Sequence, residues 1–420
     1  MYKFVIRGGN KLFGQVHVSG AKNASLALMP ACLLAPGTYT IRNTPDLRDV
    51  ATMSRLLETL GARVALSGNE QTIDTKHVAN FEAPYELVKK MRASIYVLGP
   101  LLARYGHAKV SLPGGCAWGP RPVNLHIEGM QKLGADVTLE SGYIVAKAKK
   151  LKGAHIEFDV SSVGATGNVM MAAVLAEGTT TIGNAALEPE IVALGEFLVK
   201  MGAQIQGLGT PTVTIEGVRE LHAVDFMNIP DRIETGTLLI AGAITGGSIR
   251  VINCEPTHVS ALLAKLERAG AQVITGQNWI ELKAPVEIQP VDISTSPYPG
   301  FPTDMQAQWI ALMTLSNGSS IVTETIYFDR FKHVPELVRL GADIEVKENV
   351  AIVKGVGSLK GAKVMSTDLR ASASLIIAGL VAQGTTEVLR IYHMDRGYER
   401  IEEKLKGLRA DIERVQSDEF

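Results

Sequence analysis

The chain has 420 residues, of which 46% are hydrophobic and 5% aromatic, and this length suffices for two or three domains with substantial cores. A disordered or fibrous chain is therefore excluded. Lys and Arg number 42 and Asp and Glu 43, so a formal charge of -1 provides no long-range field to attract nucleic acid or an anionic membrane. Any anion site must be a local cluster of charges.

The first residues, MYKFVIRGGN, become polar too soon for the apolar core of a secretory signal. The uncharged stretch 23–41 is interrupted by two prolines and a glycine, which favours a buried helix and a turn over a membrane span. The cysteines are 84 and 138 residues apart and form neither a disulfide framework nor a CxxC pair. We expect a cytoplasmic protein.

One short phrase recurs along the chain. It reads LETLGARV, MQKLGADV, LVKMGAQI, LERAGAQV and LVRLGADI, with a degenerate KGLRADI near the C-terminus. Its glycines are spaced 73, 68, 68 and 71 residues apart: Gly61, Gly134, Gly202, Gly270 and Gly341. Recurrence at this period predicts six structural units of about 70 residues.

Each phrase is predicted to close an amphipathic helix and to start a strand. Val50, Met53, Leu57 and Leu60 lie at i, i+3, i+7 and i+10, and the third and sixth units repeat this spacing. Glycine suits the left-handed residue that ends a helix, and the β-branched residues after it favour a strand.

A small-residue helix, a turn glycine and a strand precede each phrase, as in VMMAAVLAEGTTTI and LLIAGAITGGSIRV. Each unit is therefore predicted to be α/β, with buried helices covering one face of a sheet. Six units divide most naturally into two domains of three. We expect one domain at residues 21–229 and another from 1–20 plus 230–420, with a hinge at the two crossings.

Charged residues start several of the apolar helices. A helix N-terminus already favours anions, so a basic residue there is unfavourable for stability alone and indicates an anion site. A solvated surface charge is the alternative for each position. These helix starts are Lys22 with Asn23, Arg92, Arg232, Asp304 and Arg370.

The segment LPGGCAWGPRPVNLH, residues 112–126, combines a glycine-rich loop, a cysteine and an arginine before a new helix. A nearby Arg lowers a thiol pKa from about 8.5, which would make Cys116 an acid or nucleophile near neutral pH. Cys32, in a core helix, and Cys254, at a strand end, are interpreted as packing residues.

Two further segments carry charged residues. Asp304 in PGFPTDMQAQ is either a helix cap or a general base. Arg396 in YHMDRGYERIEEKL is either a site residue or a surface partner of Asp395 or Glu399. The nine histidines lack metal-site spacing, and the chain has no P-loop, Rossmann glycine motif or GxSxG elbow.

Seven motifs stand in one order along the chain: GAKNAS, PGGCAxGxRPVxLH, SVGAT, PDRIETGT, FPTDMQAQ, TDLRASAS and DRGYERIEEKL. With them the sequence closely resembles the family of UDP-N-acetylglucosamine enolpyruvyl transferases (1-carboxyvinyltransferases) over essentially its whole length. The resemblance implies a two-domain inside-out α/β barrel, with three repeats per domain and substrates in the cleft between the domains.

The resemblance also implies the reaction. The 3-hydroxyl of UDP-N-acetylglucosamine adds to C2 of phosphoenolpyruvate and phosphate is then eliminated, the first committed step of peptidoglycan synthesis. Roles in cell wall biogenesis, cell shape, the cell cycle and cell division, and inhibition by fosfomycin, follow from that step. No metal, organic cofactor, nucleic acid or membrane is implied.

Residue roles carried over from the resemblance fall into three groups. Lys22, Arg121 and Arg396 would hold phosphoenolpyruvate. Cys116 would act as general acid or form a covalent pyruvate adduct, and Asp304 would take the hydroxyl proton. The residues implied to contact the nucleotide sugar or complete the site are Asn23, Arg92, Arg121, Pro122, Val123, Asn124, Leu125, Ser161, Ser162, Val163, Ile326, Arg330 and Arg370, of which the last two are expected to close the cleft.

Three positions depart from the family pattern: Asn124 replaces a usual Asp, Trp118 an aliphatic residue and Val160 a frequent Lys. They leave open a related transferase with another acceptor, such as shikimate phosphate or a nucleoside. A catalytically silent paralogue that senses the nucleotide sugar is a second alternative, although Lys22 and Asp304 are intact. A repeat scaffold for protein partners is the third, and it would not require charged helix starts.

Overall fold

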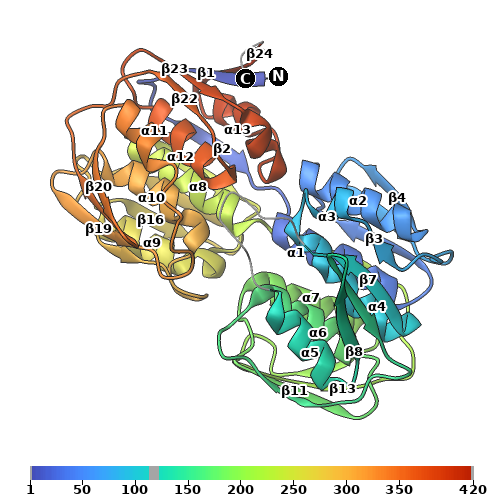
Figure 1. The fold of residues 1–420 in the computed structure, drawn as a ribbon. Coiled ribbons are helices and arrows are strands. Elements are labelled where there is room, and N and C mark those ends of the chain that lie inside the picture. The colour runs from blue at the N-terminus through green and yellow to red at the C-terminus, as the bar shows by residue number, and fades with distance from the viewer. Residues whose placement is uncertain (1, 113–122, 418–420) are drawn as a thin grey trace. The chain divides into compact units, whose positions relative to one another are not determined.

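The computed structural model describes residues 2–112 and 123–417. The chain divides into a continuous unit, Gly20–Ile229, and a split unit, Met1–Ser19 with Pro230–Phe420. Each unit contains three four-stranded mixed sheets, which confirms the predicted α/β class and its sixfold repetition (Figure 1). In the described part of the chain, no helix combines the length and apolar character that crossing a bilayer requires.

The continuous unit holds the sheets β14-β3-β5-β4, β6-β7-β9-β8 and β10-β11-β13-β12. Their strands are β3 (Thr38–Arg42), β4 (Arg63–Ser67), β5 (Glu70–Asp74), β6 (Glu82–Ala83), β7 (His107–Ser111), β8 (Asp136–Glu140), β9 (Tyr143–Lys147), β10 (His155–Glu157), β11 (Thr179–Gly183), β12 (Gln204–Gln206), β13 (Thr212–Glu216) and β14 (Asp225–Met227). In each sheet an edge strand pairs parallel with the next strand, and a hairpin completes the sheet. Because β14 pairs with β3, the third repeat is joined to the first.

Helices of two kinds cover these sheets, as the repeat pattern predicts. The apolar ones are α1 (Lys22–Ala31), α4 (Leu98–Tyr105) and α6 (Val163–Ala173), preceded or followed by the 3-10 turns η1 (Cys32–Leu34) and η2 (Arg92–Val97). The others are α2 (Arg48–Leu60), α3 (Tyr85–Val88), α5 (Asn124–Lys132) and α7 (Pro189–Lys200). The predicted stripe of α2, from Val50 to Leu60, is buried in the core of this unit.

The split unit holds the sheets β16-β17-β15-β2, β18-β19-β21-β20 and β22-β23-β1-β24. Their strands are β1 (Tyr2–Arg7), β2 (Phe13–His17), β15 (Ser248–Ile252), β16 (Gln272–Thr275), β17 (Trp279–Lys283), β18 (Ile293–Ser294), β19 (Ser319–Thr323), β20 (Asp343–Lys347), β21 (Val350–Lys354), β22 (Lys363–Met365), β23 (Thr385–Leu389) and β24 (Asp411–Gln416). The N-terminal β1 lies between β23 and β24, and β2 pairs parallel with β15. These two strands therefore complete the sixth and fourth sheets.

Three apolar helices form the centre of the split unit, with the sheets outside them (Figure 1). They are α8 (Arg232–Ile244), α10 (Gln306–Met313) and α12 (Leu369–Gly379), and each contacts the other two. The remaining helices are α9 (Ser260–Arg268), α11 (Val334–Arg339) and α13 (Ile401–Gly407), with 3-10 turns η3 (Pro256–Val259), η4 (Thr303–Met305) and η5 (Ile391–Arg396). Small side chains on the central helices permit this close packing.

The glycine that closes each amphipathic helix has the predicted left-handed conformation. Its φ ranges from +90° at Gly134 to +111° at Gly202 in the five complete phrases. In the degenerate sixth phrase Arg409 occupies the equivalent position and keeps a φ of +76°. The backbone geometry of the repeat thus survives the loss of the glycine.

Candidate active site

A carboxylate held between two guanidiniums lies beside the start of α10 in the split unit. Oδ1 of Asp304 is 2.6 Å from Nη2 of Arg330, and Oδ2 is 2.6 Å from Nη2 of Arg370. The side chains of the arginines are 11% and 9% exposed and that of Asp304 is 25% exposed. One carboxylate cannot neutralise two guanidiniums, so this triad keeps a net positive charge and can bind an anion.

The local structure explains how these side chains are directed. Asp304 lies in η4, and neither η4 nor α10 has a side-chain cap, so the interpretation of Asp304 as a helix cap is wrong. Arg370 is in the first turn of α12, which Asp368 caps by accepting from the N–H groups of Arg370 at 2.8 Å and Ala371 at 3.2 Å. The capping carboxylate in this region is therefore Asp368, at the start of α12, and not Asp304.

The charges of the triad determine the protonation of Asp304. Burial would raise the pKa of its carboxyl, but the guanidiniums of Arg370 and Arg330 outweigh burial and hold that pKa well below its usual range. Burial would lower the pKa of Arg370, and Asp304 raises it instead. Asp304 is thus ionised at neutral pH and is a weak base while both guanidiniums are bound.

A second, fully buried carboxylate, that of Glu324, is linked to the triad by hydrogen bonds through Thr303. Glu324 accepts hydrogen bonds from Thr295 and Thr303, each at 2.8 Å, and from the backbone N–H of Ile326 at 2.8 Å. The hydroxyl oxygen of Thr303 also accepts from Nη1 of Arg330 at 2.6 Å. Sequence reasoning missed Glu324 and Thr303, because a carboxylate at a strand end has no distinctive pattern.

Arg396 is the last residue of η5 and is partly buried. Burial and the nearby charge of Arg396 lower the pKa of His393. Asp395, one of the surface partners considered for Arg396, forms an ion pair with Arg414, with 2.7 Å between Oδ1 and Nη2.

In the continuous unit, α1 begins at Lys22, as predicted. Its Nζ lies 2.8 Å from Oδ2 of Asp49, and the two side chains are 13% and 5% exposed. Asn23 follows in the same turn and is partly buried. Arg92 begins η2 rather than an α-helix, and α4 starts six residues later at Leu98.

The starts of α5 and α6 lie side by side. Val123 and Asn124 begin α5, Ser162 caps α6 by accepting from the N–H of Ala165 at 3.3 Å, and Val163 is the first residue of α6. Nδ1 of His126 lies 3.0 Å from the side-chain nitrogen of Asn168, which joins the two helices. The predicted nucleotide-sugar residues Val123–Leu125 and Ser161–Val163 are thus brought together at two helix N-termini, which suit phosphate groups.

Sequence reasoning missed His126, although it ends the glycine-rich segment. The side chain is 3% exposed. Burial, reinforced by Arg92, lowers its pKa to about 3, so the imidazole is neutral in the physiological range. Its link to Asn168 needs this neutral form, because Nδ1 must accept the amide hydrogen bond.

The cysteines described by the structure are Cys32 and Cys254, and both are buried as predicted. Burial raises the pKa of Cys32 and brings that of Cys254 to about 11. Cys116, Arg121, Pro122 and Trp118 lie outside the described residues. Within the ranges 2–112 and 123–417, no three His, Cys, Asp or Glu side chains gather as a metal site.

Comparison with known proteins gives the family. Residues 6–405 match the sequence profile of the family described as EPSP synthase (3-phosphoshikimate 1-carboxyvinyltransferase). The chain belongs to this family of enolpyruvyl transferases. Its members transfer a carboxyvinyl group, so membership favours an enzyme over a repeat scaffold.

Relatives within the enolpyruvyl transferases are similar over the full length. Proteins named UDP-N-acetylglucosamine 1-carboxyvinyltransferase are 58% identical in Pelodictyon phaeoclathratiforme, covering 100% of both chains, and 60% identical in Chloroherpeton thalassium, covering 100% of this chain and 99% of that one. The crystal structure of the enolpyruvyl transferase NikO from Streptomyces tendae matches with a TM-score of 0.90 and 27% identity over 99% of both chains. EPSP synthase from Acinetobacter baumannii shares the fold, with a TM-score of 0.75 and 17% identity over 99% of this chain and 100% of that one.

Proposed function

We propose that this protein transfers the enolpyruvyl group of phosphoenolpyruvate to the 3-hydroxyl of UDP-N-acetylglucosamine, releases phosphate, and so catalyses the first committed step of peptidoglycan synthesis in the cytoplasm. The observation that carries the proposal is the identity of 58% and 60%, over the whole chain, with relatives that bear the corresponding name. The NikO enolpyruvyl transferase, at 27%, is far less similar in sequence.

The charge distribution supports this substrate pair. Phosphoenolpyruvate carries a phosphate and a carboxylate, and the nucleotide sugar carries a diphosphate. Lys22, Arg121 and Arg396 would hold the first substrate. Arg92, the segment Arg121–Leu125 and the segment Ser161–Val163 would hold the second, for which the adjacent starts of α5 and α6 offer N–H groups.

In the reaction a bond forms between the sugar 3-oxygen and C2 of phosphoenolpyruvate while C3 gains a proton. The bond from C2 to the phosphate oxygen then breaks, and C3 loses a proton to restore the double bond. Cys116 would supply the proton or form a covalent adduct with phosphoenolpyruvate. Asn23 and Asp304 would contact the reacting hydroxyl, and Asp304 would take its proton. Preorganised positive charge would stabilise the oxocarbenium-like intermediate and the departing phosphate.

Asp304 can perform this role only when its basicity rises. In the triad, Arg330 and Arg370 hold its pKa well below the usual range, with burial acting in the opposite direction. An anionic substrate that draws one guanidinium away would raise the pKa of the carboxyl and make it a better base. The arginines would thereby couple closure on the substrate to activation of Asp304. Ile326 would line the substrate site beside this triad, where its backbone N–H donates to Glu324.

Phosphate release from phosphoenolpyruvate with a panel of acceptors tests the function. UDP-N-acetylglucosamine should support release and yield an equimolar enolpyruvyl ether by mass spectrometry. Shikimate 3-phosphate and uridine monophosphate should not. A higher kcat/KM with either of these would favour the second candidate function, a transferase for another acceptor. That candidate is supported by two departures from the family pattern in the residues expected near the nucleotide, Asn124 and the exposed Val160. Binding of the nucleotide sugar without turnover would indicate the silent paralogue.

A further inference from the structure

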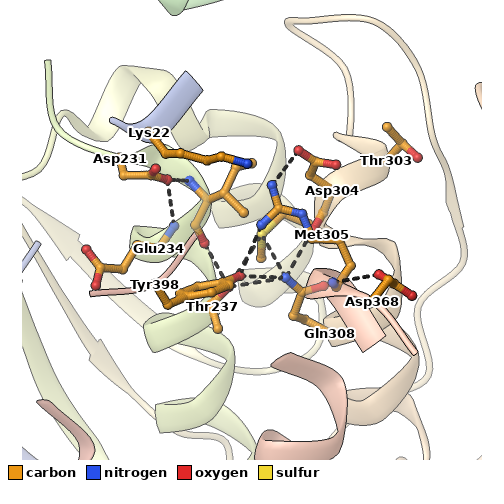
Figure 2. Close-up of polar contacts among 12 residues, drawn as sticks. Lys22, Asp231, Glu234, Thr237, Thr303, Asp304, Met305, Gln308, Asp368 and Tyr398 are labelled. Carbon is orange, nitrogen blue, oxygen red and sulfur yellow. Dashed lines mark hydrogen bonds and ion pairs between the residues drawn. The ribbon is translucent and has the colours of Figure 1, made fainter. Parts of the chain in front are cut away.

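A buried polar network lies beneath the Asp304–Arg370 pair and contains none of the residues assigned above. It consists of Thr237 from α8, Gln308 from α10 and Tyr398 just before α13 (Figure 2). Their exposed fractions are 4%, 0% and 2%. Polar side chains at this depth need partners, because an unpaired buried donor costs about 1–3 kcal/mol.

The network touches both members of the ion pair. Nε2 of Gln308 lies 3.0 Å from the backbone oxygen of Asp304 and 3.2 Å from the hydroxyl oxygens of both Thr237 and Tyr398. The Tyr398 oxygen lies 3.5 Å from Nη1 of Arg370, at the outer limit of a hydrogen bond, and the guanidinium carbon lies 6.0 Å from the centre of the phenol ring.

The donor and acceptor chemistry of the groups limits how hydrogen bonds can run through the network. An amide nitrogen and a guanidinium can only donate, so Gln308 shares its two amide hydrogens among the backbone oxygen of Asp304 and the hydroxyl oxygens of Thr237 and Tyr398, and the Tyr398 oxygen accepts from Arg370. Thr237 donates to the backbone oxygen of Ile233 at 2.8 Å, so its own oxygen must accept the phenol proton of Tyr398 across 2.8 Å. Hydrogen bonding therefore runs from Arg370 through Tyr398 to Thr237 and into α8, and Gln308 donates into this chain from α10.

This direction requires a protonated phenol. Burial raises the pKa of Tyr398, and Arg370 lowers it by a smaller amount, so the hydroxyl stays a donor at neutral pH. The network thus joins α8, α10 and α12, the three central helices of the split unit, at the place where Asp304 and Arg370 meet.

We propose that Thr237, Gln308 and Tyr398 are positioning residues that fix the backbone of Asp304 and the guanidinium of Arg370 relative to each other for the transfer reaction. The expected effect on kcat rests on the proposed function. The expected effect on the position of Arg370 relative to Asp304 rests on the geometry of this network alone. Because these side chains are buried in the helical core beneath the ion pair, they act through Asp304 and Arg370.

The test compares variants that remove one hydroxyl at constant shape. Tyr398→Phe and Thr237→Val should each lower kcat about tenfold, the effect of one lost hydrogen bond, and leave the KM for UDP-N-acetylglucosamine within about twofold. Thr237→Ser keeps the accepting oxygen and should restore kcat. Tyr39→Phe is the matched control, since Tyr39 is equally buried and its hydroxyl donates to the backbone oxygen of Ala35 at 3.0 Å in the continuous unit.

A second measurement separates this inference from the proposed function. Carbon-13 NMR of the Asp304 carboxyl, assigned with Asp304→Asn, reports its titration without any substrate. Tyr398→Phe and Thr237→Val should raise the titration midpoint, because a loosened Arg370 stabilises the carboxylate less, whereas Tyr39→Phe and Thr237→Ser should not. If the parent fails to release phosphate, the function fails and this titration still decides the positioning role.

Two results would overturn the inference. One is an unchanged midpoint together with parental kcat in Tyr398→Phe. The other is an equal loss of kcat in Tyr39→Phe, which would make the effect a general one of losing a buried phenol. Thermal unfolding of each variant guards against simple instability, and if Thr237→Val does not fold, Tyr398→Phe, which keeps the ring, carries the test.

Discussion

Oδ2 of Asp304 and Nη2 of Arg370 are 2.6 Å apart, and this contact joins the start of α10 to the first turn of α12. Arg330 holds the other carboxylate oxygen at the same distance. The carboxylate therefore does two things: it keeps two buried guanidiniums close together, and it is itself held in the ionised form. Its removal would leave like charges facing each other in a region of low exposure.

The first prediction concerns stability and pH. Removing one partner of a buried ion pair costs about 3–5 kcal/mol, and the partial exposure of Asp304 places Asp304→Asn near the lower end. A carboxyl with a lowered folded-state pKa stabilises the protein above its unfolded pKa of about 3.9, and this stabilisation is lost as pH falls through the folded value. Thermal unfolding should show a large difference between parent and Asp304→Asn at neutral pH that shrinks below about pH 4.

The control for this prediction is Asp343→Asn. Asp343 pairs with Lys354 at 3.9 Å, and both side chains are more than half exposed. Exposed pairs contribute little, so this variant should unfold at the parental temperature at every pH. A difference between parent and Asp304→Asn that persists unchanged at low pH would contradict the ionised triad.

The second prediction concerns the buried ion pair between Glu234 and Lys404, beside Ser19, the last residue before the chain enters the continuous unit. Oε1 of Glu234 lies 2.5 Å from Nζ of Lys404, and Oε2 accepts from the backbone N–H of Ser19 at 2.7 Å. Burial raises the pKa of Glu234, and Lys404 offsets part of that increase. Lys404→Met should cost about 3–5 kcal/mol at neutral pH, because an unpaired carboxylate remains buried.

The titration of the Glu234 carboxyl changes the stability of the parent with the opposite sign to that of Asp304. A raised carboxyl pKa means that the folded state binds the proton more tightly, so its stabilising effect is present below the unfolded value of about 4.3 and is lost as pH rises through the folded one. Denaturation with urea should show Lys404→Met recovering as pH falls toward about 4.5. The double variant Glu234→Gln with Lys404→Met should be close to the parent, and a double variant as unstable as the single one would refute the pairing.

The third prediction places the hinge at two residues. In the split unit the N–H of Asp231 donates to Ser19 at 2.9 Å, and in the continuous unit the N–H of Ala21 donates to Ile229 at 2.7 Å. Each unit thus ties the two crossing segments together, which leaves Gly20 and Pro230 as the pivots. X-ray scattering should show a smaller radius of gyration with UDP-N-acetylglucosamine and no change with shikimate 3-phosphate. An unchanged radius with the saturating nucleotide sugar would argue against closure.

The repeats could be predicted from the sequence because their physics is local. A glycine that must adopt positive φ and an apolar stripe with helical spacing are visible in any one unit, and Gly61 and α2 bear this out. The sixth unit shows the limit, since Arg409 hides the glycine signal while the backbone keeps its conformation. The sixth sheet is closed by β1, whose Arg7 pairs with Asp411, 404 residues further along the chain. No local sequence pattern contains such long-range pairing.

Site residues could be predicted where a basic side chain occupies a helix N-terminus, a position that favours negative charge. Arg370 at a helix start was found in this way, whereas Glu324 and Tyr398 were not. Glu324 is recognisable only from its four hydrogen-bond donors, which come from two segments of the chain. Tyr398 reads in the sequence as the first member of an apolar stripe, and its hydroxyl acquires a role only when α8 and α10 are packed beside it.

The last prediction concerns Cys116, whose thiol lies in a glycine-rich sequence five residues before Arg121. An epoxide phosphonate that mimics phosphoenolpyruvate, such as fosfomycin, should alkylate Cys116, and bound nucleotide sugar should accelerate labelling by gathering basic residues that lower the thiol pKa. Cys32 and Cys254 should stay unlabelled, because burial raises the pKa of both thiols.

Two substitutions separate the acid role of Cys116 from its role as nucleophile. Cys116→Asp keeps an acid and loses the thiol, so it should resist the epoxide while retaining turnover. Cys116→Ser offers a far weaker acid and should turn over more slowly than Cys116→Asp. Peptide mass mapping after treatment and phosphate release by each variant measure both effects. An adduct on Cys32 or Cys254, or normal turnover by Cys116→Ser at neutral pH, would make Cys116 a structural residue and leave the proton transfer to another group.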